Sequence, residues 1–192
     1  MASVESALRK AVADLNAVRA RWALVGGLAV SARTIPRFTK DLDFAVAVAD
    51  DGEAEETVHR LRSYGYYPAE ILEQDYVERL SGVRLACTGS DIVMDLLFAS
   101  SGIEGEVVAS ADQLEVLPHL TAPVASTAHL IALKVLAGRN QDLTDLSYLI
   151  SAASPTDLDT ARDAVKLIQA RGFNRQHDVV SDLDQLIRDA GR

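Results

Sequence analysis

The chain has 192 residues and a formal net charge of −9, from 19 basic and 28 acidic side chains, and 48% of it is apolar. This composition predicts one globular domain and argues against a broad, non-specific nucleic-acid surface, although a local basic groove or a basic protein partner stays open. With one cysteine, no signal peptide and no apolar run near the ~20 residues that span a bilayer, we expect a soluble cytoplasmic protein without an internal disulfide.

The first predicted element is an amphipathic helix that Ser3 caps. Its apolar stripe repeats at helical spacing and is formed by Val4, Leu8, Val12, Leu15 and Val18. Such a stripe predicts a helix that lies against the core.

The segment Trp22 to Val48, WALVGGLAVSARTIPRFTKDLDFAVAV, carries most of the chemistry. A short strand over 22–25 enters the pair Gly26-Gly27, and a helix is predicted over 27–33. Glycines let a backbone approach a phosphate closely, and the N–H groups at a helix start favour an anion. The pair therefore predicts a phosphate site, with a plain turn before a buried helix as the alternative.

Two acids follow at the start of the next apolar strand. Strand alternation places Asp41 and Asp43 on one face, where they repel each other and are costly to desolvate. Such a pair suits a hard cation such as Mg²⁺, which shares its oxygen ligands with substrate phosphates. Alternatively, the two acids cap a neighbouring element or lie on a solvated strand end. A metal and a phosphate site in one short unit indicate phosphoryl or nucleotidyl transfer.

Cations stand beside this acid pair, in a segment that Pro36 keeps irregular. Arg37 and Lys40 are candidates for contact with a triphosphate. Neutralisation of the carboxylates or a position in solvent explains them equally well.

Beyond this block the pattern predicts a turn at 50–52, a helix over 53–64 and then hairpins. The predicted hairpin strands cover 75–80, 83–88 and 91–98, with turns at Ser81-Gly82 and Gly89-Ser90. In the last strand Asp95 is the one charge within a continuous apolar run, which predicts a central strand. A buried acid is costly unless a metal or a cation pairs with it, so Asp95 is favoured over Asp91 as a third site carboxylate.

The remainder predicts short edge strands or loops around 107–108 and 115–117, then helices from a boundary at 123–127. We divide the chain into an α/β core over 1–122 and a helical part over 123–192 packed on it. Ser126 or Thr127 caps the first of these helices and Gly138 ends it, and two further helices cover 155–168 and 176–189.

Two glycines, thirteen residues and D-x-D resemble the signature of polymerase-β-like nucleotidyltransferases, and the whole chain is similar to the AbiEii/AbiGii (MenT-like) toxin branch. The resemblance implies an α/β (α+β) nucleotidyltransferase fold, a mixed twisted sheet flanked by helices with a helical C-terminal part. It also implies that Asp41, Asp43 and Asp95 hold Mg²⁺, or Mn²⁺ in its place, and that Asp95 accepts the proton of the attacking hydroxyl.

A lysine helix and the acids after it extend the resemblance. Lys134, then Arg139, Asp142 and Asp145, match the family's lysine helix and its R-x-x-D-x-x-D segment. The family pattern makes Lys134 a phosphate ligand, with the two acids completing the site and Arg139 beside the phosphates. The residues alone favour plainer roles: a lysine whose head reaches water, a capping Asp142 and an exposed Asp145.

The resemblance implies a Mg²⁺-dependent enzyme that moves NMP from an NTP to an acceptor, commonly the tRNA 3′ end, as a toxin held in check by a cognate antitoxin. Transfer to a small molecule such as an aminoglycoside, or to a protein hydroxyl, is the alternative enzyme hypothesis. A non-catalytic relative that serves as a binding partner is the alternative from another class. Neither the base of the NTP nor the acceptor follows from the sequence.

Overall fold

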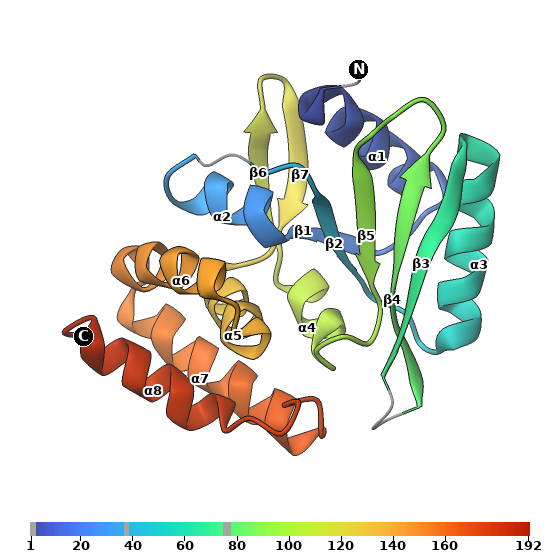
Figure 1. Ribbon diagram of the computed structural model, residues 1–192. Coiled ribbons are helices and arrows are strands. Elements are labelled where there is room, and N and C mark those ends of the chain that lie inside the picture. The colour runs from blue at the N-terminus through green and yellow to red at the C-terminus, as the bar shows by residue number, and fades with distance from the viewer. Residues whose placement is uncertain (1–2, 37–38, 75–77) are drawn as a thin grey trace.

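The computed structural model describes residues 3–36, 39–74 and 78–192, and within them seven strands form one mixed sheet (Figure 1). The strand order is β3-β4-β5-β2-β1-β7-β6. The pairs β2–β5 and β1–β7 are parallel and the others antiparallel. The strands are β1 (Trp22–Val25), β2 (Leu42–Val46), β3 (Tyr66–Gln74), β4 (Arg79–Cys87), β5 (Val93–Leu97), β6 (Asp112–Leu117) and β7 (Leu120–Val124).

Helices cover the sheet and form the C-terminal part. They are α1 (Val4–Ala17), α2 (Gly26–Arg33), α3 (Asp51–Leu61), the 3₁₀ turn η1 (Arg62–Tyr64), α4 (Glu104–Ala109), α5 (Thr127–Ala137), α6 (Asn140–Ala152), α7 (Pro155–Ala170) and α8 (Val179–Asp189). Figure 1 shows α3 beside β3 and β4, and α5 to α8 gathered together away from that edge. None of the described helices is both long enough and apolar enough to cross a membrane.

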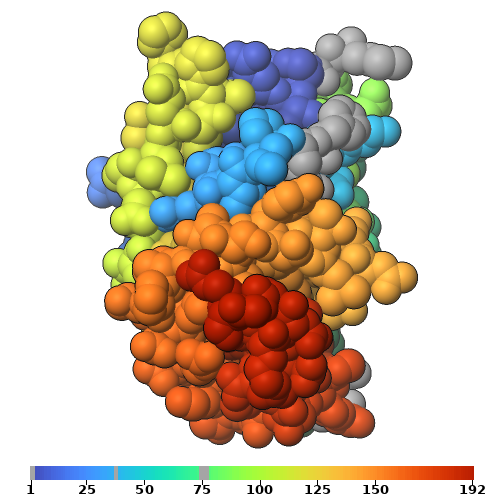
Figure 2. All heavy atoms as spheres, turned by 90° about the vertical axis from the view of Figure 1, so that its left-hand side faces the viewer, coloured from blue at the N-terminus to red at the C-terminus, as the bar shows by residue number. Residues whose placement is uncertain are grey.

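Helix α5 is the first of the C-terminal helices and contacts α2, α6, α7 and α8. Figure 2 shows α2 in blue at the surface between the yellow β6–β7 hairpin and the orange and red C-terminal helices. The sheet ends at Val124 and α5 begins at Thr127, so the change from strands to helices occurs where the sequence predicts it. The division into 1–122 and 123–192 stays a prediction.

Local capping signals are confirmed. Ser3 Oγ accepts the Ser6 N–H at 3.1 Å at the start of α1, and Ser126 Oγ accepts the His129 N–H at 3.3 Å at the start of α5. Gly138 ends α5 in the left-handed region, with φ 62°. These caps fix where the helices begin and end, and so which side chains face the core.

The expected turn at Ser81-Gly82 is wrong, because both residues lie inside β4. A Cβ on Gly82 would lie 2.8 Å from the carbonyl oxygen of Leu96 in the neighbouring strand, so the glycine serves close strand packing rather than a turn. The partner strand is β3, which begins at Tyr66. The predicted strand over 75–80 falls in part on 75–77, outside the described residues.

Two shorter predictions also need correction. Val107 and Val108 lie in α4 instead of a strand or loop. The expected turn at 50–52 is the start of α3, where Asp50 Oδ1 accepts the Glu53 N–H at 3.0 Å. Asp favours turns and helix caps through the same side-chain-to-backbone hydrogen bonds, so sequence alone does not separate the two.

Candidate active site

A cavity of about 570 Å³ opens where α2, β2 and β5 meet α5 and α6, and most of the predicted site residues line it. These are Gly26, Gly27, Lys40, Asp41, Asp43, Asp95, Lys134 and Arg139. Asp142 and Asp145 contact Lys134 instead of lining the cavity. Arg37 lies outside the described residues. The fold therefore gathers segments that are more than a hundred residues apart in sequence.

The glycine pair shapes the floor of this cavity. Gly26 has φ +63°, and a Cβ built on it would lie 2.0 Å from Asp43 Oδ2. Only glycine leaves room for the carboxylate there. No side chain within the described residues caps the start of α2, whose N-cap is Val25. The first N–H groups of α2 are therefore not capped by that side chain and can donate to an anion, while the phosphate site itself stays a prediction.

Three carboxylates line this cavity. Asp43 in β2 and Asp95 in β5 are register partners across the parallel strand pair, and Asp41 precedes β2 by one residue. The pKa of Asp43 is raised from 3.8 to about 6: burial and the negative charges of Asp95 and Asp41 raise it, and the positive charges of Lys134 and Arg139 oppose them. Because the pKa stays raised although these two cations oppose it, a further cation is favourable beside Asp43.

The donor set of Asp41 and Asp43 fits Mg²⁺, which is commonly held by one or two carboxylates, substrate phosphates and water. In the part of the chain that the structure describes, no group of three or more His, Cys, Asp or Glu side chains is arranged to hold a metal ion. The third expected ligand, Asp95, is engaged elsewhere. Metal coordination by Asp95 stays a prediction.

Asp95 is engaged by Arg84, a residue that sequence reasoning missed. Arg84 Nε lies 2.8 Å from Asp95 Oδ1 and Nη2 lies 2.7 Å from Oδ2, a bidentate ion pair. The two residues are register partners in the antiparallel pair β4–β5. The sequence predicts that a metal or a cation compensates the charge of Asp95, and in the structure the guanidinium of Arg84 does so. The identity of this cation depends on strand register, and the predicted hairpin of 83–88 and 91–98 around Gly89-Ser90 carried that signal, because it places residue 84 opposite residue 95.

Lys134 is a buried hub with a side chain only 7% exposed. Its Nζ lies 2.7 Å from Asp142 Oδ1 and 2.7 Å from Asp145 Oδ2, so these two bonds use two of its three N–H donors. Asp142 Oδ2 also accepts the backbone N–H of Arg139 at 3.2 Å and its Nε–H at 2.8 Å. Asp142 thus closes a capping box at the start of α6 and balances the lysine, while the predicted phosphate role of Lys134 stays a prediction.

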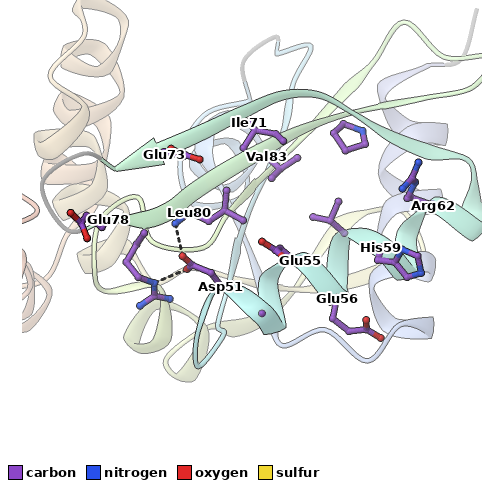
Figure 3. Close-up of a pocket in the computed structure, with 14 residues that line it drawn as sticks. Asp51, Glu55, Glu56, His59, Arg62, Ile71, Glu73, Glu78, Leu80 and Val83 are labelled. Carbon is purple, nitrogen blue, oxygen red and sulfur yellow. Dashed lines mark hydrogen bonds and ion pairs between the residues drawn. The ribbon is translucent and has the colours of Figure 1, made fainter.

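A larger cavity, of about 890 Å³, lies between α3 and strands β3 and β4 (Figure 3). None of the predicted site residues lines it. Figure 3 shows Asp51 turned toward Leu80, whose N–H it accepts at 3.1 Å, and Asp51 also pairs with Arg79 at 2.6 Å. The Arg79 hydrogen bond lowers the pKa of Asp51. A carboxylate balanced in this way needs no metal, so the smaller cavity is the candidate active site.

Comparisons with known proteins agree with this geometry. The family model "Nucleotidyl transferase AbiEii toxin, Type IV TA system" matches residues 9–191. No curated protein sequence matches the chain significantly.

Solved structures resemble the chain at low sequence identity. The crystal structure of a candidate nucleotidyltransferase from H. pylori is 17% identical with TM-score 0.50, over 97% of this chain and 91% of that one. The solution structure of the antibiotic-resistance factor ANT(2'')-Ia is 18% identical with TM-score 0.47, over 95% and 88%. Because the family model spans nearly the whole chain and the cavity unites its glycine pair with the acids, the protein belongs to the AbiEii nucleotidyl transferase toxin family and is a nucleotidyltransferase.

Proposed function

We propose that the protein moves NMP from an NTP to an acceptor hydroxyl in the 570 Å³ cavity, with Mg²⁺, or Mn²⁺ in its place, as the metal. The observation that carries this proposal is the position of Asp43. Its carboxylate lies against Gly26 at the start of α2 and beside Asp95 across the strand pair. An anion-binding helix start and a repelled carboxylate pair in one cavity match the two needs of nucleotidyl transfer, phosphate binding and metal binding.

The residues divide the work between them. Asp41 and Asp43 would hold the metal, which when bound supplies charge neutralisation at the phosphates and a lower pKa for the attacking hydroxyl. The N–H groups of Gly26 and Gly27 face the phosphates. Lys134 offers its third N–H donor and the exposed Arg139 its guanidinium, with Lys40 at the cavity edge.

In the transfer step the acceptor oxygen forms a bond to the α-phosphorus, the bond from that phosphorus to the α–β bridging oxygen breaks, and pyrophosphate leaves. The hydroxyl proton passes to Asp95, which Arg84 holds in a fixed orientation. Asp142 and Asp145 act through Lys134 by fixing its ammonium group.

For the acceptor, we propose the 3′ end of tRNA and a cytoplasmic role as the toxin of a toxin–antitoxin pair, with a cognate antitoxin as partner. The name of the matched family supports the toxin role. The exposed cations at the cavity, Lys40 and Arg139, support a local contact with a nucleic acid despite the net charge of −9.

Label transfer tests the proposal. Wild type and Asp43→Ala are incubated with each α-labelled NTP, Mg²⁺ and total RNA, and separately with protein alone. Label on RNA that depends on Asp43 supports the proposal and identifies the nucleotide. Label on protein, or on a small hydroxyl compound instead of RNA, would replace the tRNA acceptor. A folded protein that transfers no label under any of these conditions contradicts the proposed reaction and favours a non-catalytic binding role.

A further inference from the structure

Arg175 lines the same cavity as the site acids, although it comes from the segment between α7 and α8 and has no part in the mechanism above. Its Nη2 lies 3.2 Å from Ser100 Oγ and 3.4 Å from the Ser100 carbonyl oxygen. Ser100 follows β5, the strand that carries Asp95. These contacts bring the C-terminal helical part to the edge of the site.

The charge of Arg175 is poorly balanced. Arg84 and Arg139 each pair with an aspartate, but no carboxylate of the described residues lies within 4.0 Å of the Arg175 guanidinium. The residue keeps exposed surface, as expected at a cavity edge, yet the surrounding protein and then the positive charge of Arg139 lower the pKa of Arg175. Glu104 acts in the opposite direction, but its Oε1 accepts the N–H groups of Ser100 and Ser101.

The backbone holds Arg175 in this place at a cost. Arg175 has φ 52° and the next residue, Gln176, has φ 63°, so two successive residues with side chains occupy the left-handed region. Such conformations persist where the surrounding structure holds them, and they concentrate at ligand-binding sites. The fold thus keeps a guanidinium near the positive charge of Arg139 inside a concave site.

We propose that Arg175, together with Arg139, binds the phosphate chain of the NTP. An anion between two guanidinium groups replaces their repulsion with attraction, and the planar fork of arginine matches phosphate oxygens in pairs. The cavity of about 570 Å³ has the size of a small-molecule site. The inference rests on the proposed function and adds a residue from the C-terminal part to it.

The test is a binding titration by calorimetry with wild type, Arg175→Gln and Arg162→Gln. Arg162 is the matched control, because it lies on α7, pairs with Asp159 and Asp184 and does not line the cavity. The probes are inorganic tripolyphosphate and the non-hydrolysable α,β-methylene analogue of each NTP, both with Mg²⁺. We expect Arg175→Gln to bind both the analogue and tripolyphosphate with about tenfold lower affinity than wild type. Arg175→Lys should restore part of the lost affinity, and Arg162→Gln should bind as wild type does.

Equal affinity of wild type and Arg175→Gln for both probes overturns the inference and leaves nucleotidyl transfer standing. Loss of affinity for an RNA acceptor with unchanged tripolyphosphate binding also overturns it, because the arginine then serves the acceptor. A wild type that binds none of the analogues removes the proposed function as well.

A second measurement needs no variant and holds even if Arg175→Gln folds poorly. Phenylglyoxal modifies accessible arginines of the wild-type protein, and peptide mass spectrometry locates the products. Tripolyphosphate should protect Arg175 and leave Arg162 reactive. Equal modification of Arg175 with and without tripolyphosphate contradicts the proposal.

Discussion

The side chain of Asp43 fills the position that a side chain on Gly26 would need: a Cβ on Gly26 would lie 2.0 Å from Asp43 Oδ2 and 2.7 Å from Asp43 Cβ. The residue at the helix start proposed to bind a phosphate is therefore also the residue that leaves room for the carboxylate proposed to bind the metal. One glycine joins the two halves of the proposed site, and the first prediction follows from it.

Gly26→Ala should abolish activity and destabilise the fold. The methyl group must displace Asp43, and the φ of +63° adds about 1–2 kcal/mol of backbone strain. We expect kcat to fall by about a hundredfold or more, because a catalytic group displaced by about 1 Å costs that much. Gly89→Ala is the control, since Gly89 has φ +80° and nothing within 4 Å of an added Cβ. Equal activity in the two variants, measured by label transfer, contradicts the shared role of Gly26.

Asp43 should make stability depend on pH in the absence of metal. Its pKa is raised from 3.8 to about 6, so the folded state holds its proton more tightly than the unfolded state does. The corresponding stability is fully present below pH 3.8 and is lost as pH rises through about 6. At pH 8 in EDTA, Asp43→Asn should therefore be more stable than wild type by about 3 kcal/mol, since one pKa unit corresponds to about 1.4 kcal/mol.

Urea unfolding at pH 4 and pH 8 measures this difference, which should shrink toward pH 4. Saturating Mg²⁺ should stabilise wild type at pH 8 and leave Asp43→Asn unchanged, because ligand binding to the folded state adds to its stability. Asp91→Asn, which removes an exposed acid, serves as the control. A wild type that is more stable than Asp43→Asn at pH 8 in EDTA would show that the carboxylate is already compensated.

Lys134→Met should strongly destabilise the protein. It leaves Asp142 and Asp145 without the buried ammonium that both contact at 2.7 Å. Removal of one partner of a buried ion pair costs about 3–5 kcal/mol. The triple variant Lys134→Met, Asp142→Asn, Asp145→Asn should recover part of that loss, and Lys166→Met, at an exposed pair with Asp163, should change little. Chemical denaturation measures the free energy of unfolding of all three variants. If Lys134→Met alone lowers it by less than about 1 kcal/mol, the two ion pairs of Lys134 do not stabilise the fold as proposed.

Arg84→Lys should reduce kcat by about tenfold while the fold remains. Lysine keeps the positive charge but loses the two parallel hydrogen bonds that fix both oxygens of Asp95. The exposed Arg60, which pairs with Glu56, provides the control variant Arg60→Lys. Steady-state kinetics, with the NTP concentration varied at a non-limiting acceptor concentration, separate kcat from KM. Unchanged kcat in Arg84→Lys would mean that the orientation of Asp95 does not matter for transfer.

Most local features follow from the sequence because their causes lie within a few residues. Ser126 caps α5 and Gly138 ends it through bonds to neighbouring backbone groups, and the alternation of Leu42, Asp43 and Phe44 between buried and less buried positions follows from strand geometry. The glycine pair is likewise visible in the sequence, and so are the acids of D-x-D and Asp95, whose negative charges demand compensation when they are buried. Their meeting in one cavity agrees with that expectation.

Tertiary structure decided which side chains enter the cavity and which ion pairs form there. The register of β4 on β5 agrees with the hairpin predicted around Gly89-Ser90, but the bidentate pair of Arg84 with Asp95 is visible only in the folded protein. Arg175 reaches the cavity only because the segment between α7 and α8 contacts Ser100. Strand register and helix docking are set by the packing of surfaces far apart in sequence, so the sequence by itself determined which groups needed partners and the fold chose the partners.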